Sequence, residues 1–217
     1  MRRLIFGRKY VQPADLNNSL FINNIASPVV MNGMVTRTTD HKGGNTAIQF
    51  GSGNLVSINN LPASTVWSVA FWAKTNQTAI SIITELTNNY NSKYAFYSSI
   101  NEYVKGKIVI GSWGNNYKIK IASSVNFNDN QWHHWVFILN RNETGDNEIK
   151  IYRDKVQLLL STEYSLNNEQ TGSYVSDKIY LGGRGTSYQY PFVGATSPFK
   201  LFNYPLTQTN IDNLYNE

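Results

Sequence analysis

Short apolar stretches, each rich in Val, Ile, Phe, Tyr or Trp, alternate with Gly, Asn, Asp or Pro from about residue 46 to the end of the chain. The stretches are AIQF, NLVSI, VWSVAFWAK, ISIITEL, KYAFYSS, KIVIGS, YKIKIAS, QWHHWVFILN, EIKIY, VQLLLS, KIYLGG and PFKLFNY. Many short strands at regular spacing are typical of an antiparallel sandwich or barrel. The pattern therefore predicts an all-β domain over residues 46–217, with no linker inside it.

Alternation within two strands predicts which side chains share a face. In the first, the faces are Trp67, Val69, Phe71 and Ala73 against Ser68, Ala70, Trp72 and Lys74. In the second, they are Trp132, His134, Val136 and Ile138 against His133, Trp135, Phe137 and Leu139. Since the second strand is bulky on both faces, it should be buried on both. We expect its outer face to be covered from within the chain by residues 1–45, with a partner chain as the alternative.

Two further local signals complete the pattern. The segment 207–215, TQTNIDNLY, places Ile211, Leu214 and Tyr215 on one stripe, which predicts the only helix of the domain. Gly114, Asn115 and Asn116 separate two strands and predict a hairpin turn.

Residues 1–45 differ from the rest and form a separate lead-in segment. Basic and apolar side chains crowd its first nine residues, which we interpret as an anchoring arm that orders on a partner, or as a frayed terminus. The candidate anchoring residues are Arg2, Arg3, Phe6, Arg8 and Lys9. The apolar run 4–6 is too short for a secretory signal, which needs about 7–15 apolar residues.

Composition narrows the function classes. Charged residues make up 15% of the chain, and about 28 residues are Asn, roughly twice an ordinary share. Asn favours turns, so this composition suits a β protein rich in loops. The net charge of +5 is concentrated in the arm, which leaves a nearly neutral body and argues against nucleic acid as a partner. There is no Cys, which excludes disulfides and thiol chemistry. No apolar run is long enough for membrane insertion.

Several segments, in order, resemble the laminin G-like branch of the concanavalin A-like lectin/glucanase superfamily, which also includes pentraxins. The segments are 46–58, 67–73, 131–137 (QWHHWVF), 149–154 (IKIYRD), 179–183 (IYLGG), 192–194, 200–206 (KLFNYPL) and 211–215. The resemblance covers about residues 46–217. It implies a jelly-roll β-sandwich of two antiparallel sheets with one short C-terminal helix.

The chain departs from the resembled family where some relatives bind calcium. The family usually carries an acidic residue after its "F-x-G" motif, but Ala195, Thr196, Ser197 and Pro198 follow Gly194 here. Calcium sites usually need two or more carboxylates. The acidic residues Asp129, Asp146, Asp154 and Asp177 fall in different predicted loops. We therefore expect no cofactor and no metal, and calcium only if the missing ligand is replaced.

No catalytic constellation stands out, so we predict that the chain is not an enzyme. Glycoside hydrolysis needs a suitably spaced carboxylate pair. The nearest match, Glu143, Asp146 and Glu148, is interrupted by Gly145, and we interpret it as a solvated turn. The adjacent His133 and His134 point to opposite faces of a strand, so they cannot chelate one metal. The resemblance implies that they are structural and hydrogen-bonded. Gly182, Gly183, Arg184 and Gly185 open no helix, so we interpret them as turn residues rather than a phosphate cradle.

Aromatic side chains in turn-rich segments supply the candidate ligand site. They are Tyr90, Trp113, Tyr117, Tyr188 and Tyr190, with several Asn residues nearby in sequence. Sugars stack on aromatic rings and hydrogen-bond to amides, so these residue types suit a glycan; packing at the rim is the alternative. We predict a binding or structural protein, displayed on a larger assembly such as a phage virion or appendage and gripping host glycans. Such a protein would lie in the virion or cytoplasm, or outside the cell after lysis, with an assembly or self-association as its partner. The alternatives are a free carbohydrate-binding module or lectin and a glycan-cleaving enzyme.

Overall fold

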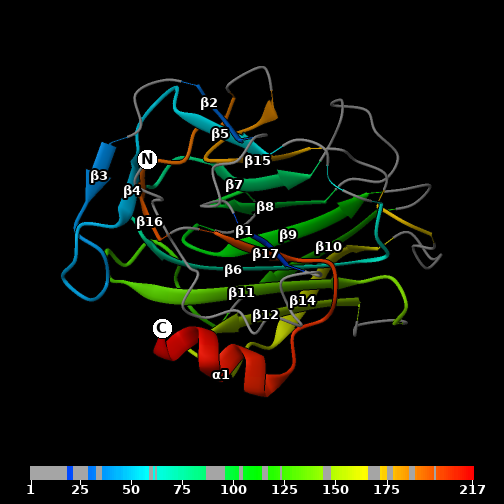
Figure 1. Cartoon of the computed structure of the whole chain (residues 1–217). Coiled ribbons are helices and arrows are strands. Elements are labelled where there is room, and N and C mark those ends of the chain that lie inside the picture. The colour runs from blue at the N-terminus through cyan, green and yellow to red at the C-terminus, as the bar shows by residue number, and fades with distance from the viewer. Residues whose placement is uncertain are drawn as a thin grey trace.

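The computed structural model is a two-layered β-sandwich with one helix on its outside (Figure 1). It describes residues 19–21, 29–32, 36–58, 61, 63–86, 96–102, 105–113, 117–122, 124–143, 148–165, 172–174, 178–185, 189–197 and 199–217. Every strand pair in it is antiparallel, as the sequence predicts. No helix in these ranges is both long and apolar enough to cross a membrane.

Within the described residues, the first sheet has nine strands and runs in the order β13-β12-β11-β6-β16-β4-β3, with β17 also paired to β6 and β1 to β17. Its strands are β1 (Ser19–Phe21), β3 (Thr36–Thr38), β4 (Ala47–Phe50), β6 (Val66–Lys74), β11 (His133–Asn140), β12 (Ile149–Arg153), β13 (Val156–Gln157), β16 (Gly194–Thr196) and β17 (Lys200–Phe202). The centre is the long pairing of β11 with β6, in which Trp135 lies opposite Phe71.

The second sheet, in the part of the chain that the structure describes, has eight strands in the order β14-β10-β9-β8-β7-β15-β5-β2. They are β2 (Val29–Asn32), β5 (Leu55–Ile58), β7 (Ser81–Leu86), β8 (Phe96–Ile100), β9 (Ile108–Trp113), β10 (Tyr117–Ala122), β14 (Leu160–Ser165) and β15 (Ile179–Leu181). The predicted hairpin at 114–116 is confirmed by the pairing of Trp113 with Tyr117 at the ends of β9 and β10, although the turn itself lies outside the described residues.

The main core lies between the two sheets and has the predicted composition. From β6 and β11 it takes one of the two predicted faces of each strand, Trp67, Val69, Phe71 and Ala73 with Trp135, Phe137 and Leu139. The second sheet supplies aliphatic and aromatic partners, including Ile83, Leu86, Phe96, Ile108 and Ile110. Burial of so many large side chains is the dominant stabilising contribution to such a fold.

The outer face of β6 and β11 is also buried from within the chain. In the described residues its cover comes from the C-terminal helix α1 (Gln208–Asn216) and, from the expected segment 1–45, from His41 stacked on Trp72 at 4.0 Å. The side chains of residues 1–35 lie outside the described part, so cover by them stays a prediction. A second apolar cluster joins the sheet to the helix. It contains Ala70, Val136, Ile138, Tyr152, Phe202, Leu206, Ile211 and Leu214. Figure 1 shows α1 lying along β11 and β12.

Several contacts fix α1 in this position. Thr207 caps its N-terminus in a capping box with Asn210, which satisfies backbone groups that a helix start leaves free. At the other end Glu217 pairs with Lys200 of β17. Tyr215 packs on Trp72 with ring centroids 5.1 Å apart. The predicted helix is thus confirmed.

Residues 19–38 contribute three short strands to the sandwich. β1 pairs with β17, β2 with β5 and β3 with β4. Part of the lead-in segment therefore extends both sheets at the level of the backbone. The predicted anchoring arm, including Arg2, Arg3, Phe6, Arg8 and Lys9, lies outside the described residues and stays a prediction.

Candidate functional site

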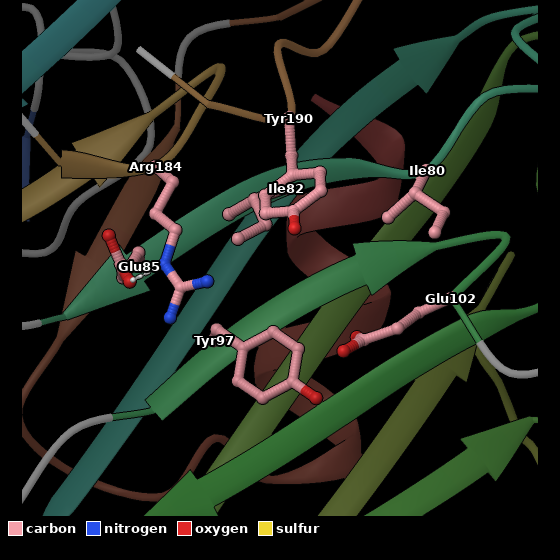
Figure 2. A pocket seen from close by; sticks show the side chains of 7 residues that line it. All are labelled: Ile80, Ile82, Glu85, Tyr97, Glu102, Arg184 and Tyr190. Atoms are coloured by element: carbon pink, nitrogen blue, oxygen red, sulfur yellow. Dashed lines mark ion pairs between the residues drawn. The ribbon is translucent and has the colours of Figure 1, made fainter. Parts of the chain in front are cut away.

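A hollow opens on the outer face of the eight-stranded sheet, above β7 and β8. It encloses about 420 Å³, counting the space that is open to solvent. Its lining is Ile80, Ile82, Glu85, Tyr97, Glu102, Arg184 and Tyr190 (Figure 2). The pairing of the strands explains this placement. Glu85 lies opposite Tyr97 and points away from the core, whereas the next pair, Leu86 and Phe96, faces the core. A register shift between Ile82 and Thr84 lets Ile83 face the core as well. The hollow combines apolar surface with three charged groups.

Tyr97 forms the floor of the hollow by lying across Gly111 of β9. These two residues are direct cross-strand partners. A Cβ atom at Gly111 would lie 2.0 Å from the Cε1 atom of the Tyr97 ring, so the ring occupies space that any other residue would fill. The tyrosine is only 2% exposed. The glycine thus sets the depth of the hollow.

Glu85 and Arg184 form an ion pair at the side of the hollow. The Nε atom of Arg184 lies 3.4 Å from Oε1 of Glu85, whose side chain is almost fully buried. Burial raises the pKa of Glu85 to about 7, although the charge of Arg184 and a hydrogen bond from the Gly185 backbone act in the opposite direction. Its second oxygen, Oε2, is buried without a hydrogen-bond partner among the described residues. A buried polar atom in this state is costly and rare.

The rim is formed by the segment that follows β15. Gly182, with φ of +87°, starts this segment; a Cβ atom there would lie 2.3 Å from Phe50. The backbone N–H of Arg184 donates to the carbonyl of Gln189, and the N–H of Ile82 donates to the carbonyl of Tyr190. These bonds hold Arg184 and Tyr190 over β7. Figure 2 shows both side chains reaching into the hollow from this segment.

Tyr190 and Glu102 face solvent more than the floor does. Tyr190 is 42% exposed and has a left-handed φ of 52°, which is uncommon for a bulky residue. Backbone strain of this kind concentrates at binding sites. The Glu102 carboxylate accepts a 2.5 Å hydrogen bond from the Ser99 hydroxyl. Ile80, 41% exposed, completes an apolar edge.

Of the ligand residues predicted from the sequence, the structure places only Tyr190 in the hollow. Trp113 and Tyr117 pair through their backbones at the β9–β10 hairpin, but their side chains are not described, and Tyr90 and Tyr188 lie outside the described residues. The sequence analysis missed Glu85, Tyr97 and Arg184. Two signals were present: a lone Glu in the apolar run SIITEL, and an Arg within the turn GGRG.

The adjacent histidines sit in different surroundings at the end of β11. Nδ1 of His133 lies 2.6 Å from Oδ2 of Asp154, and its Nε2 lies 3.1 Å from Asp129. His134 is buried between Trp72 and Tyr215, and burial lowers its pKa to about 3, with further lowering by Lys200 and His41. The Nδ1 atom of His134 has no hydrogen-bond partner among the described residues. The predicted hydrogen-bonded role thus holds for the side chain of His133, and among the described residues it does not hold for Nδ1 of His134.

The carboxylates considered at the sequence level lie partly as expected. Asp129 and Asp154 lie in separate loops, as predicted, and both contact His133. Glu143 is exposed in a turn as expected, but Glu148 is buried, so the interpretation as a solvated turn was wrong for Glu148. Within the described ranges no three His, Asp or Glu residues are arranged to hold a metal ion.

Comparison with known proteins agrees with this architecture. The family model of the concanavalin A-like lectin/glucanases superfamily matches residues 42–212. The chain belongs to this superfamily. No curated protein sequence matches the chain.

Solved structures of similar fold include several binding domains. Domain 4 of AbnA, an extracellular arabinanase of Geobacillus stearothermophilus solved with arabinotriose, has a TM-score of 0.64 at 17% identity, with 87% of this chain and 88% of that chain covered. The binding domain of Paraclostridial Mosquitocidal Protein 1 has a TM-score of 0.68 at 12% identity and coverages of 92% and 52%. The botulinum neurotoxin serotype D ligand-binding domain, solved with N-acetylneuraminic acid, has a TM-score of 0.64 at 17% identity and coverages of 92% and 50%. The superfamily member described here therefore spans about half of each toxin binding domain.

Proposed function

We propose that the chain is a non-catalytic glycan-binding domain and that the hollow above β7 and β8 is its binding site. The observation that carries this proposal is the buried carboxylate of Glu85, a residue that lines the hollow and whose Oε2 atom lacks a hydrogen-bond partner among the described residues. Buried polar atoms are normally satisfied, so a partner from outside is the economical explanation. A hydroxyl group of a bound ligand supplies such a hydrogen-bond partner for Glu85.

The lining suits a sugar in its other properties. A sugar ring has apolar C–H faces and a periphery of hydroxyls that both donate and accept. The exposed ring of Tyr190 and the side chain of Ile80 offer apolar surface at the rim. Arg184 offers guanidinium donors, and Glu102 offers carboxylate acceptors. Sites for small ligands typically combine apolar lining with a few polar groups of this kind.

The similar structures support the same class of function. Domain 4 of AbnA was solved with arabinotriose, and the serotype D toxin domain with N-acetylneuraminic acid. At these identities the likeness concerns the fold. The site on this chain is argued from its own residues.

A glycan-cleaving enzyme is the second candidate, and one observation favours it. The raised pKa of Glu85 is a feature of the general acids of glycosidases. Against it, Glu85 is engaged by Arg184, and the other lining carboxylate, Glu102, is held by Ser99. Incubation of the chain with arabinan, β-glucan and chitin oligosaccharides, followed by mass spectrometry, separates the two. Intact oligosaccharides are the expected result, and shortened ones identify an enzyme.

Binding itself is tested on a glycan array with the full chain and two matched variants. Tyr190→Asn removes an exposed ring from the rim while retaining a residue that tolerates left-handed backbone. Leu159→Asn removes a side chain that is 85% exposed and not among those lining the hollow, and serves as the control. Binding by the wild type and by Leu159→Asn, with loss in Tyr190→Asn, is expected. An array without signal for the wild type would refute the proposal.

We propose, as the setting of this binding, display on a larger assembly such as a phage virion or appendage. The support comes from the sequence: a basic, partly apolar arm in front of a nearly neutral, Asn-rich body. Deletion of residues 1–13 should abolish incorporation into the particle and leave glycan binding intact. Normal incorporation of the truncated chain would contradict the anchoring role, and the free lectin would then be the better description.

A further inference from the structure

The acceptor and donor groups in the hollow are neighbours, which limits the ligand they fit. Oε1 of Glu85 lies 3.4 Å from Nε of Arg184, so a carboxylate and a guanidinium stand side by side. Glu85 lines the hollow, and the Oε2 atom of the same carboxylate is buried without a hydrogen-bond partner in the described part of the chain. Gly185 packs close to this atom, since a Cβ atom there would lie 3.4 Å from Oε2. Figure 2 shows the two side chains along the same wall.

Adjacent hydroxyls match such a pair. One hydroxyl donates to the carboxylate, and the next accepts from a guanidinium N–H, which is a donor in every protonation state found in proteins. Hydrogen bonds to charged groups are stronger than neutral ones, and a pair of them fixes orientation. Vicinal hydroxyls occur on the rings of most sugars.

The charges of the lining disfavour an acidic sugar. Two carboxylates, Glu85 and Glu102, line the hollow with one guanidinium, Arg184. The guanidinium is already paired, so a ligand carboxylate would gain little from it and would be repelled by Glu102. Rejection of a like charge in a site of this kind gives specificity.

We propose that the hollow recognises adjacent hydroxyls of a neutral sugar, with Glu85 accepting from one and Arg184 donating to the next, and that it rejects carboxylated sugars. This inference rests on the proposed glycan-binding function and adds the class of glycan. The exposed side chains of Tyr190 and Ile80 then pack on the C–H face of the same ring.

The test uses the full chain and saturation-transfer NMR with calorimetry at pH 8. The neutral probes are lactose, cellotetraose and arabinotriose. The charged probe is 3′-sialyllactose, and its neutral control is the methyl ester of the same sugar, which has nearly the same bulk without the negative charge. We expect at least one neutral probe to bind. We also expect the affinity for 3′-sialyllactose to be lower than the affinity for its ester by about tenfold or more. Equal or tighter binding of the acid would overturn the inference.

Variants locate the recognition at this pair. Glu85→Gln keeps the shape and removes the charge, and Arg184→Ala removes the donors. Each variant should lower the affinity for the neutral probe about tenfold or more. Glu143→Gln, which removes an exposed carboxylate from the turn after β11, should leave this affinity unchanged. Thermal melts verify that each variant is folded. Where a variant at a buried residue does not fold, Tyr190→Asn is used in its place to test binding at the hollow.

The outcomes separate the two proposals. If no probe and no array glycan binds, the proposed glycan binding is refuted, and the proposed preference for neutral sugars is refuted as well. If glycans bind but the variants at Glu85, Arg184 and Tyr190 match the wild type, the chain is a lectin that uses another surface, and only this inference is overturned.

Discussion

The carboxylate of Asp154 holds His133 from the neighbouring hairpin: Oδ2 lies 2.6 Å from Nδ1 of the imidazole. Its other oxygen accepts a 2.9 Å hydrogen bond from the backbone N–H of His134. Asp154 and Lys155 form the two-residue turn between β12 and β13, with φ of 50° and 73°. Such a turn normally favours glycine. The hydrogen bonds between Asp154 and β11 therefore help to hold its backbone in the left-handed conformation, which a residue other than glycine disfavours.

The first prediction concerns this contact. Asp154→Asn keeps the size of the side chain and its tolerance of left-handed backbone but removes the charge that pairs with His133. We expect the free energy of unfolding to fall by about 1–3 kcal/mol in urea titrations, because hydrogen bonds to charged groups are worth this much. Glu143→Gln, at an exposed turn, should stay within about 0.5 kcal/mol of the wild type. A loss no larger than the control's would show that the contact is incidental.

The second prediction concerns the docking of α1. Ile211 is completely buried in the cluster between the helix and the sheet. Ile211→Ala should lower the free energy of unfolding by about 2–5 kcal/mol, through lost burial and a cavity. Asn213→Ala, on the exposed face of the same helix, is the control and should change it by less than about 0.5 kcal/mol. Similar values for the two variants would mean that the helix contributes little to stability.

The interior of the sandwich was predictable because strand alternation decides it locally. Side chains of β6 and β11 lie on the faces that the sequence assigns, and residues 207–215 form the helix. The large apolar side chains on both faces of β11 also predicted that its outer face is buried. The sequence did not show which segment covers that face, since this depends on the path of the chain after β17. The apolar stripe of the predicted helix was the one available clue.

The candidate site was largely beyond prediction for a physical reason. Its groups come from β7, β8 and the segment after β15, which are far apart in sequence and meet only through strand order. Exposed aromatics in turns are a weak signal, and of those proposed only Tyr190 has a described side chain, which lies in the hollow. A charged residue within an apolar strand, such as Glu85, is the better signal, because a buried carboxylate must be paired with a cation or hydrogen-bonded to a protein group or a ligand.

The third prediction tests how the floor of the hollow is built. Gly111→Ala places a methyl group 2.0 Å from the present position of the Tyr97 ring, which must then move into the hollow. We expect a loss of about 1–3 kcal/mol in unfolding free energy, as for other overpacked sites, and weaker binding of any glycan found on the array. Gly51→Ala is the control, since its nearest atom beyond the adjoining residues would be 3.6 Å away. Unchanged binding by a folded Gly111→Ala protein would place the glycan elsewhere.

The last prediction follows from the burial of Glu85. Its pKa is raised from 4.5 to about 7 in the folded chain, chiefly by burial. Between these values the unfolded chain releases the proton while the folded chain retains it. The stabilisation present below pH 4.5 is therefore lost as the pH rises to 7. Such a shift corresponds to about 3 kcal/mol.

Glu85→Gln removes this titration and leaves the other groups in place. We expect wild-type stability, measured by urea unfolding at pH 4.5 and pH 8, to fall by about 3 kcal/mol more than that of the variant. The Glu143→Gln control should follow the wild type. Parallel curves for wild type and Glu85→Gln would mean that the carboxyl titrates normally. Glu85 would then face the hollow as an ordinary carboxylate at neutral pH, and a neutral sugar would meet a fully charged acceptor.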